Sequence, residues 1–357
     1  MLDWLRQDSE LPFHVELTLQ VIIVTIAIII IFTLILSFIV IGLRIKNIQK
    51  EKHWQKLERK WERLIFDIMA NELEAEQIWA TVHPRERLYF LQYLLRFARR
   101  VRGEEFNTIK SMAKPYLYLL ESRVKKGPPE LRARAVQTLG VLGFPDYIQP
   151  VIEALDDPAP IVSMLAARAL ARKEYPDNVR FILPIIHRFE NWSMSYLSAL
   201  LALFGEGASS YLRATLADPT QDNMVRTACS DALKKLMDLK SADVANEVIN
   251  SEKDPELLAS LLRLLRSTGR KEHLDTVRSM IDSPEFIVRA NAYSTLGFLG
   301  VETDRKCLIK GIEDNNTWVA IHAARALMKL GGQTQLEKIA LSNRSRSHLV
   351  QQVISEG

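Results

Sequence analysis

The longest apolar stretch of the chain runs from Val21 to Leu43. It carries no charge and is interrupted only by two threonines, one serine and one glycine. As a helix it would rise about 1.5 Å per residue, which is enough to cross a hydrocarbon core of roughly 30 Å. A cleaved signal peptide has a basic leader and an apolar core of about 7 to 15 residues, whereas residues 1–20 are acidic here. The pattern therefore predicts an uncleaved transmembrane helix over residues 21–43.

The charges on either side of this stretch predict its orientation. Residues 1–43 contain one Arg and four acidic residues, while residues 44–126 contain 19 Lys and Arg against 11 Asp and Glu. Cationic flanks stay on the cytoplasmic side of a membrane. We expect residues 1–20 to form a short extracytoplasmic N-terminus and the rest of the chain to be cytoplasmic, with a bacterial inner membrane as the expected location. The two widely spaced cysteines agree with a reducing compartment.

Residues 44–126 are expected to form a basic helical juxtamembrane adaptor. Its first part has apolar residues at alternating spacings of three and four, which places them in one stripe along a helix. These residues are Trp54, Leu57, Trp61, Leu64 and Ile68. The stripe either docks onto the following helices or forms a homodimer seam, although two heptads are short for a coiled coil.

A second adaptor helix, between Pro84 and Gly103, carries arginines in its last turns. Cations at that end interact favourably with the helix dipole, so a solvated helix end accounts for them. The alternative is that they contact anionic lipid headgroups close to the anchor. The candidate lipid-surface residues are Arg96, Arg99, Arg100, Arg102, Lys125 and Lys126.

Beyond the adaptor, one amphipathic pattern recurs at a nearly constant interval. Its seven units begin at Leu131, Val162, Ser193, Val225, Leu257, Val288 and Val319. If each of these residues is position 1, position 9 is Leu in all seven units and position 5 is small or apolar. Positions 1, 5, 8, 9 and 12 share one face of a helix. Position 13 is Gly in five units, where we expect it to end the helix in a left-handed conformation.

A shorter apolar helix follows the first helix of each unit, as in "PDYIQPVIEAL" after Gly143. One helix pair cannot bury both of its faces alone, so stacked pairs are needed to form a continuous core. Alternation of the strand type is absent from these segments. The repeats therefore predict an all-α solenoid over residues 127–357.

The repeated phrase D-P-x-x-V-R-x-x-A-x-x-A-L-x-x-L-G resembles the short HEAT-like repeat of many bacterial proteins, including phycobilin lyase-type proteins. "EFIVRANAYSTLGFLG" is among the segments that carry it best, and the resemblance covers roughly residues 127–341. It implies a right-handed α-solenoid of about seven HEAT-like helix pairs. It also implies a protein-binding scaffold more often than an enzyme, although a fold alone does not determine a ligand.

The resemblance further implies a role for the arginine of the Val-Arg step, which in the family commonly pairs with an acidic residue in a neighbouring turn. By position, the expected pairs are Arg226 with Asp218 and Arg289 with Asp282. Two units, which begin at Ser193 and Leu257, lack the Val-Arg step and carry Leu at positions 5 and 8. We expect wider stacking at these two units.

The chain carries no local motif that is typical of an enzyme or a metal site. Its seven histidines form no close pair, and C-x-x-C, phosphate-loop and G-x-S-x-G patterns are missing. We therefore predict no catalytic residues, no metal and no cofactor. Residues 127–357 contain 27 Lys and Arg against 28 Asp and Glu, which argues against a groove that binds nucleic acid.

Recognition is expected on the surface that the second helices line. Exposed aromatic and arginine side chains are typical hot spots of protein interfaces. The candidate partner-binding residues are Arg188, Trp192, Tyr196, Arg213 and Trp318. The alternative for the two tryptophans is that they fill wide gaps between repeats.

These features together predict a membrane-anchored cytoplasmic scaffold that binds membrane-associated partner proteins by non-catalytic contact. One alternative is an accessory subunit of a larger membrane complex, in envelope biosynthesis or secretion. A second alternative is a lyase-like enzyme or a chaperone for a prosthetic group.

Overall fold

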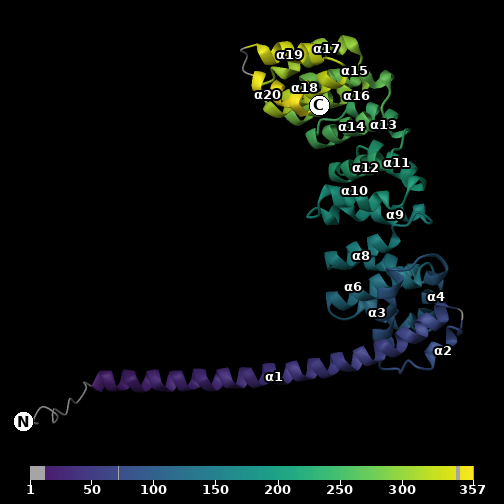
Figure 1. Ribbon diagram of the computed structural model, residues 1–357, viewed down its shortest axis with the longest axis vertical. Helices are drawn as coiled ribbons and strands as arrows, with labels where there is room; N and C mark the ends of the chain where they lie inside the picture. Colours follow the sequence, from purple (N-terminus) through teal and green to yellow (C-terminus); the bar gives the residue numbers. More distant parts are fainter. Residues whose placement is uncertain (1–12, 71, 343–345, 357) are drawn as a thin grey trace, which may run out of the picture. The chain divides into compact units, whose positions relative to one another are not determined.

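The computed structural model describes residues 13–70, 72–342 and 346–356, and these residues form helices and turns without a strand (Figure 1). The all-α prediction is confirmed. The chain divides into two compact units. The first unit contains Met1–Arg87 and Arg102–Met112, and the second contains Leu88–Val101 and Ala113–Gly357.

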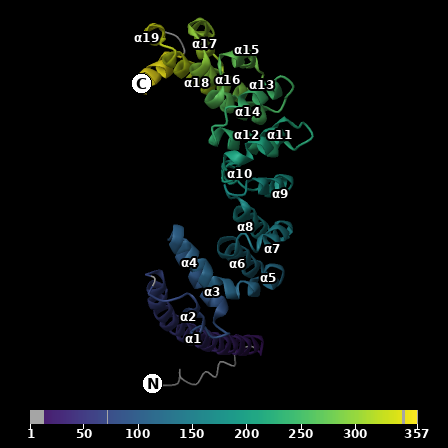
Figure 2. The same cartoon turned by 90° about the vertical axis from the view of Figure 1, so that its right-hand side faces the viewer.

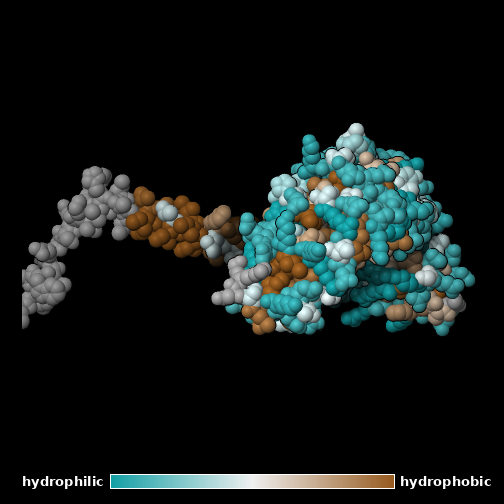
Figure 3. Space-filling model, turned by 90° about the horizontal axis from the view of Figure 1, so that it is seen from above, coloured by the Kyte–Doolittle hydropathy of each residue, from teal (hydrophilic) through white to brown (hydrophobic). Residues whose placement is uncertain are grey.

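In the first unit, the apolar stretch and the start of the adaptor form one helix, α1 (Phe13–Met69), which is 57 residues long. Proline is absent from this range and Gly42 is its only glycine, so nothing in the sequence breaks the helix. The helix therefore begins before Val21, while residues 1–12 of the predicted N-terminal segment lie outside the described residues. Figure 3 shows the apolar part as a hydrophobic band, and its most apolar window is unburied. By length and composition α1 can cross a membrane, but a signal sequence near the N-terminus meets the same two criteria.

The predicted apolar stripe of the adaptor lies near the C-terminal end of α1. Trp61, Ile65 and Ile68 are buried there, and the other predicted stripe residues are half-buried. Two shorter helices belong to this part of the chain, α2 (Glu76–Trp79) and α4 (Gly103–Ala113). The stripe is thus covered within a single chain, as the docking interpretation expects.

The second unit contains seven helix pairs that follow one another in sequence order (Figures 1 and 2). Two helices precede them, α3 (Arg87–Ala98) and α5 (Tyr118–Lys125). The first helices of the pairs are α6 (Pro129–Thr138), α8 (Pro160–Leu170), α10 (Met194–Ala202), α12 (Asn223–Lys235), α14 (Pro255–Thr268), α16 (Phe286–Leu299) and α18 (Thr317–Lys329). The second helices are α7 (Ile148–Glu153), α9 (Val179–Ile182), α11 (Ser209–Ala217), α13 (Ser241–Ile249), α15 (Leu274–Ser279), α17 (Arg305–Ile312) and α19 (Gln333–Leu341). A last helix, α20 (Ser347–Glu356), packs against α18.

The repeated leucine forms the centre of each helix pair. All seven position-9 leucines have no exposed side-chain area; they are Leu139, Leu170, Leu201, Leu233, Leu265, Leu296 and Leu327. The position-5 residues are buried as well. Complete burial of one leucine contributes about 1.5–3 kcal/mol, so the repeated positions supply a large part of the core.

Stacking is wider at only one of the two units where we expected it. Adjacent first helices pack closely from α10 through α18, and α6 packs on α8, but α8 and α10 are not among the closely packed pairs. The unit of α10 places Leu197 and Leu200 in its core, where most units have smaller residues at one or both positions. The unit of α14 also carries leucines there, yet it packs closely on both neighbours.

The prediction for the position-13 glycines is wrong for three of the five. Only Gly205 and Gly331 have positive φ among them, at 71° and 74°. Gly300 instead has an ordinary φ of −61°, and a Cβ built there would lie 2.4 Å from the carbonyl oxygen of Leu296. Glycine is therefore needed at Gly300 because the chain leaves the helix close to its own backbone, and not because of a left-handed conformation.

Candidate interaction surface

In three of the repeats, an arginine near the start of the first helix pairs with an acidic side chain in the turn that follows the same repeat. The three pairs are Arg132 with Asp157 at 2.7 Å, Arg226 with Glu252 at 2.5 Å, and Arg289 with Asp314 at 2.9 Å. In each case the acid lies 25 or 26 residues after the arginine. The side chain thus links one repeat to the turn that leads into the next.

The expected pairs Arg226–Asp218 and Arg289–Asp282 are therefore wrong. Asp218 accepts hydrogen bonds within its own turn, from the backbone N–H and the hydroxyl of Thr220. Asp282 is largely exposed and forms a distant ion pair with Lys310, at 3.8 Å. The resemblance correctly implied an ion pair for these arginines, but the acid comes from the following turn instead of the preceding one.

Two of the predicted partner-binding residues make similar bonds inside the solenoid. Arg213, on α11, contacts both carboxylate oxygens of Asp238 at 2.7 Å. Arg188 lies in a 3-10 helix (Leu183–Phe189) after α9 and donates to the carbonyl oxygens of Leu155 and Asp157, each at 2.8 Å. Both guanidinium groups connect neighbouring repeats.

These ion pairs predict a loss of stability in acid. The hydrogen bond that Arg132 donates to Asp157 lowers the pKa of that carboxyl group, although burial alone would raise it. Burial alone would raise the pKa of Asp314, but Arg289 and the Asn316 N–H more than offset it. A carboxylate with a lowered pKa stabilises the fold above its unfolded-state value, about 4, and this contribution is lost as the pH falls through the folded-state value. We expect urea denaturation of the full-length protein in detergent to show falling stability below about pH 4.

Asp157→Asn and Asp314→Asn are the variants that check this interpretation. Each should be less stable than the original protein near pH 7, and the difference should shrink as the pH falls, because the original carboxylate then becomes neutral too. A difference that stays constant down to pH 2 would show that these carboxylates do not cause the acid sensitivity.

Aromatic side chains recur in one stripe of the first helices. Positions 4, 7 and 11, with position 0 just before position 1, lie on one side of the helix next to the core positions; we call this the first-helix stripe. Trp192 and Tyr196 occupy positions 0 and 4, and their ring centroids are 5.1 Å apart. Trp318 and His322 occupy the same two positions four units later, at 4.9 Å. Three predicted partner-binding residues thus lie on this stripe. Tyr196 and Trp318 belong to the first helices α10 and α18, and Trp192 lies just before α10.

The most unusual point of the first-helix stripe is an exposed phenyl ring between two cations. Phe298 is 55% exposed. Lys329 Nζ lies 3.5 Å and Arg266 Cζ lies 5.7 Å from the centre of its ring. Burial, and then the charge of Arg266, lower the pKa of Lys329. Arg266 donates to the hydroxyl of Ser294 at 2.9 Å, so this cluster holds positive charge beside an exposed apolar ring.

The cluster of Arg266, Phe298 and Lys329 was not among the predicted site residues. Phe298 and Lys329 are at position 11 of consecutive units, so the register of the repeats already places these two side by side, whereas Arg266 is at position 10. The prediction put recognition on the second helices, whereas these three residues belong to first helices. Trp318 is 53% exposed on the same helix as Lys329, so it does not simply fill a gap between repeats.

The candidate lipid-surface residues fall in both units. Arg96 lies over the ring of Tyr93 at 5.0 Å, and Lys125 pairs with Glu153 at 2.6 Å. Arg99 and Arg100 follow α3 and are exposed, and Lys126 is exposed after α5. Arg102 belongs to the first unit, so the structure does not place it relative to the others.

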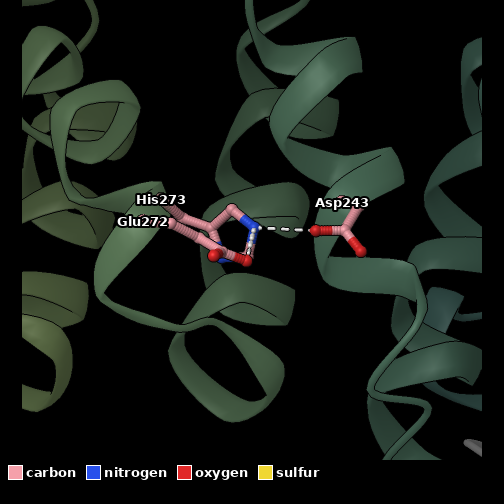
Figure 4. Close-up of side chains that lie close together, drawn as sticks. All are labelled: Asp243, Glu272 and His273. Atoms are coloured by element: carbon pink, nitrogen blue, oxygen red, sulfur yellow. Dashed lines mark hydrogen bonds and ion pairs between the residues drawn. The ribbon is translucent and has the colours of Figure 1, made fainter.

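One group of side chains has the composition of a metal site. Asp243, Glu272 and His273 bring their ligand atoms together (Figure 4). However, His273 Nδ1 accepts the backbone N–H of Arg270 at 3.0 Å, which leaves Nε2 to donate to Asp243 at 3.1 Å. The imidazole therefore has no lone pair left for a metal. The Arg270 guanidinium already contacts both carboxylates, so the group is a satisfied structural network.

Comparison with known proteins agrees with the repeat architecture. The family model of HEAT repeats matches residues 117–192 and 244–328. No curated protein matches the chain. The complex of CpcE and CpcF of phycocyanin lyase from Nostoc sp. PCC7120 is similar, with 18% identity, coverage of 67% of this chain and 87% of that chain, and a TM-score of 0.32.

Two further solved structures have weaker sequence identity. Kap121p bound to Pho4p shows 10% identity, with coverage of 77% of this chain and 42% of that chain and a TM-score of 0.40. Human deoxyhypusine hydroxylase in complex with glycerol shows 15% identity, with coverage of 74% of this chain and 98% of that chain and a TM-score of 0.31. This chain thus spans less than half the length of Kap121p. The chain thus contains HEAT repeats at residues 117–192 and 244–328, within a second unit that is built of seven successive helix pairs.

Proposed function

We propose that the protein is a membrane-anchored scaffold that binds partner proteins through its HEAT repeats by non-catalytic contact. The observation that carries the proposal is the exposure of Phe298 and Trp318 in repeats whose core leucines are fully buried. Large exposed aromatic side chains on an otherwise well-packed surface are typical of protein interfaces.

The charges around Phe298 favour an acidic partner. Lys329 and Arg266 both lie against its ring, and the hydrogen bond of Arg266 goes to the neutral hydroxyl of Ser294. A carboxylate of a partner that approached the ring would meet two cations in a partly desolvated place, where ion pairs are stronger than in water. The aromatic ring would supply affinity and the cations would supply selectivity.

The membrane part of the proposal rests on α1. Its apolar window has a mean hydropathy of 3.2 and no buried part, and cationic residues follow Leu43 closely. We propose that residues 21–43 cross a bacterial inner membrane with the N-terminus outside and the repeats in the cytoplasm. The anchor would then raise the local concentration of a partner at the membrane.

We expect the double variant F298A/W318A to recover at least about tenfold less partner than the original protein, because aromatic hot spots each contribute roughly 2 kcal/mol or more. The measurement is affinity purification of full-length protein from gently solubilised membranes, with quantitative mass spectrometry. Phe286→Ala is the matched control, because Phe286 is a 46% exposed phenylalanine on α16, the helix that also carries Phe298. Phe286 lies outside the first-helix stripe.

Each other outcome of the purification points to one of the alternatives. Unchanged recovery with F298A/W318A would reject the first-helix stripe as the partner surface. If recovery were instead lost when residues 21–43 are exchanged for an unrelated transmembrane helix, the protein would be a subunit held through its membrane helix. A visible absorption band of the purified protein would favour the prosthetic-group alternative.

A further inference from the structure

A groove lies on the first-helix stripe at the start of the second unit. It has a volume of about 520 Å³, and its lining includes Arg99, Gln137, Gly140, Arg168 and Arg172. These residues come from the segment after α3, from the end of α6 and its continuation, and from α8 and the residues that follow it. A volume of this size is typical of sites for small molecules, which are roughly 300–1,000 Å³.

The structure holds one of the three arginines in a fixed position. Arg172 donates from one terminal N–H group to the carbonyl oxygen of Gly140 and from Nε to that of Ala169 at 3.2 Å. Its guanidinium carbon lies 4.5 Å from the centre of the Phe144 ring. A guanidinium group has five N–H donors, so these two bonds leave three of them unused. Arg172 is therefore oriented in advance and can still donate to a ligand.

The other two arginines bring charge that the protein does not neutralise. Arg99 and Arg168 are exposed, and within the described ranges neither side chain forms a hydrogen bond or an ion pair. No Asp or Glu belongs to the described lining of the groove. Burial lowers the pKa of Arg172, and the charge of Glu174, which is exposed, offsets only part of that effect. Three cations thus share one concave site without a carboxylate in it.

We propose that this groove binds a phosphate group, carried either by a lipid headgroup or by a soluble organic phosphate. Guanidinium groups match the oxygens of a phosphate in pairs, and several of them can surround its three or four oxygens at once. A single carboxylate would leave most of these donors unused. The amide of Gln137 supplies a further donor at the same site. This site is independent of the partner surface around Phe298, so the two proposals can fail separately.

The test uses full-length protein in dodecyl maltoside, a detergent without phosphate. The protein is titrated with inorganic phosphate and, separately, with dihexanoyl phosphatidylglycerol, and binding is followed by calorimetry at constant ionic strength. We expect saturable binding of at least one probe. The double variant R99A/R168A should bind at least about tenfold more weakly, since charge-assisted hydrogen bonds are lost. Both side chains are exposed, so the variant is expected to fold.

The control variant R100A/R134A changes the net charge by the same amount. Arg100 and Arg134 are also exposed, they lie close in sequence to the groove residues, and neither lines the groove. Binding by this control should stay within about twofold of the original protein, because long-range charge effects are screened by salt. Equal losses in the two double variants would overturn the proposal, since general positive charge would then explain the binding.

The two probes distinguish the source of the phosphate. Binding of the lipid alone would identify a headgroup site and binding of inorganic phosphate would identify a site for soluble phosphates, provided that R99A/R168A weakens it. Saturation by neither probe, or binding that R99A/R168A leaves unchanged, would overturn the proposal.

Discussion

Replacing Arg226 by alanine is expected to lower the free energy of unfolding by about 3–5 kcal/mol, the usual cost of breaking a buried ion pair from one side. Arg226 is only 5% exposed and Glu252 is 12% exposed. The arginine donates to Glu252, to the Asn223 side chain and to the carbonyl oxygen of Leu216. It therefore joins the end of α11, the start of α12 and the turn after α13, and its loss removes one partner from each of these three places.

The main cost should come from the carboxylate that remains behind. Burial alone would raise the pKa of Glu252, but the N–H groups of Asp254 and Lys253 and the charge of Arg226 lower it overall. Without Arg226, this charge keeps its burial and loses its counterion. We expect urea denaturation to show the loss of stability, and hydrogen exchange to locate it in α11, α12 and α13, since repeats contact only their neighbours.

Two further variants make this prediction specific. R226A/E252Q removes the stranded charge, so it should be more stable than R226A alone at neutral pH. Arg325→Ala breaks a surface pair with Glu356, in which the side chains are 44% and 40% exposed, and it should have a much smaller effect. If R226A and R325A lowered the free energy of unfolding by the same amount, the ion pairs between repeats would not explain the stability of the stacked repeats.

The repeats could be predicted from sequence because their cause is local. A leucine that recurs once in each repeat, on a face shared with small residues, must be buried wherever helices stack. Leu139 belongs to the first repeat and Leu327 to the last, yet both are fully buried at the same position of their repeats. The number of helix pairs follows directly from this periodicity.

The partners of the arginines could not be predicted in the same way. Whether Arg289 turns to Asp282 or to Asp314 depends on how one repeat is rotated on the next, and a linear pattern holds no information on that rotation. The sequence distance even favoured the wrong choice, because Asp282 is nearer than Asp314. For the same reason the sequence did not indicate that Arg188 and Arg213 would be used inside the solenoid.

The surface clusters could be predicted from the sequence in part, unlike the partners of the arginines. Phe298 and Lys329 have the same position in consecutive repeats, so the periodicity predicts that they are neighbours. That Arg266 joins them, and that Phe298 stays 55% exposed, depends on side-chain directions that only the three-dimensional structure supplies. The groove of Arg99 and Arg168 also needs the structure, since α3 lies outside the repeated pattern.

Placing two arginines in the apolar stretch, as I31R/L34R, is expected to release most of the protein from the membrane. Each arginine near the centre of a membrane helix costs about 2.5–3.5 kcal/mol on insertion scales, and each also replaces a favourable apolar residue. Together the changes should reduce membrane insertion by several orders of magnitude. The measurement is fractionation of cells that express the tagged full-length protein, followed by an alkaline wash that removes peripheral proteins.

The variant I45R/I48R separates the position of the charge from its amount. Ile45 and Ile48 lie on the same helix α1 and are exposed, but they fall in the cationic segment that we place on the cytoplasmic side, so this protein should stay in the washed membranes.

The intact mass of the purified protein decides whether the apolar stretch is an anchor or a cleaved signal sequence. A mass that lacks the apolar stretch would identify a cleaved signal sequence, whereas the complete mass, together with release of I31R/L34R alone, would mean that α1 is the anchor. The helix continues without a break from the apolar stretch into the buried residues Trp61 and Ile65, and cleavage near residue 43 would divide that continuous element.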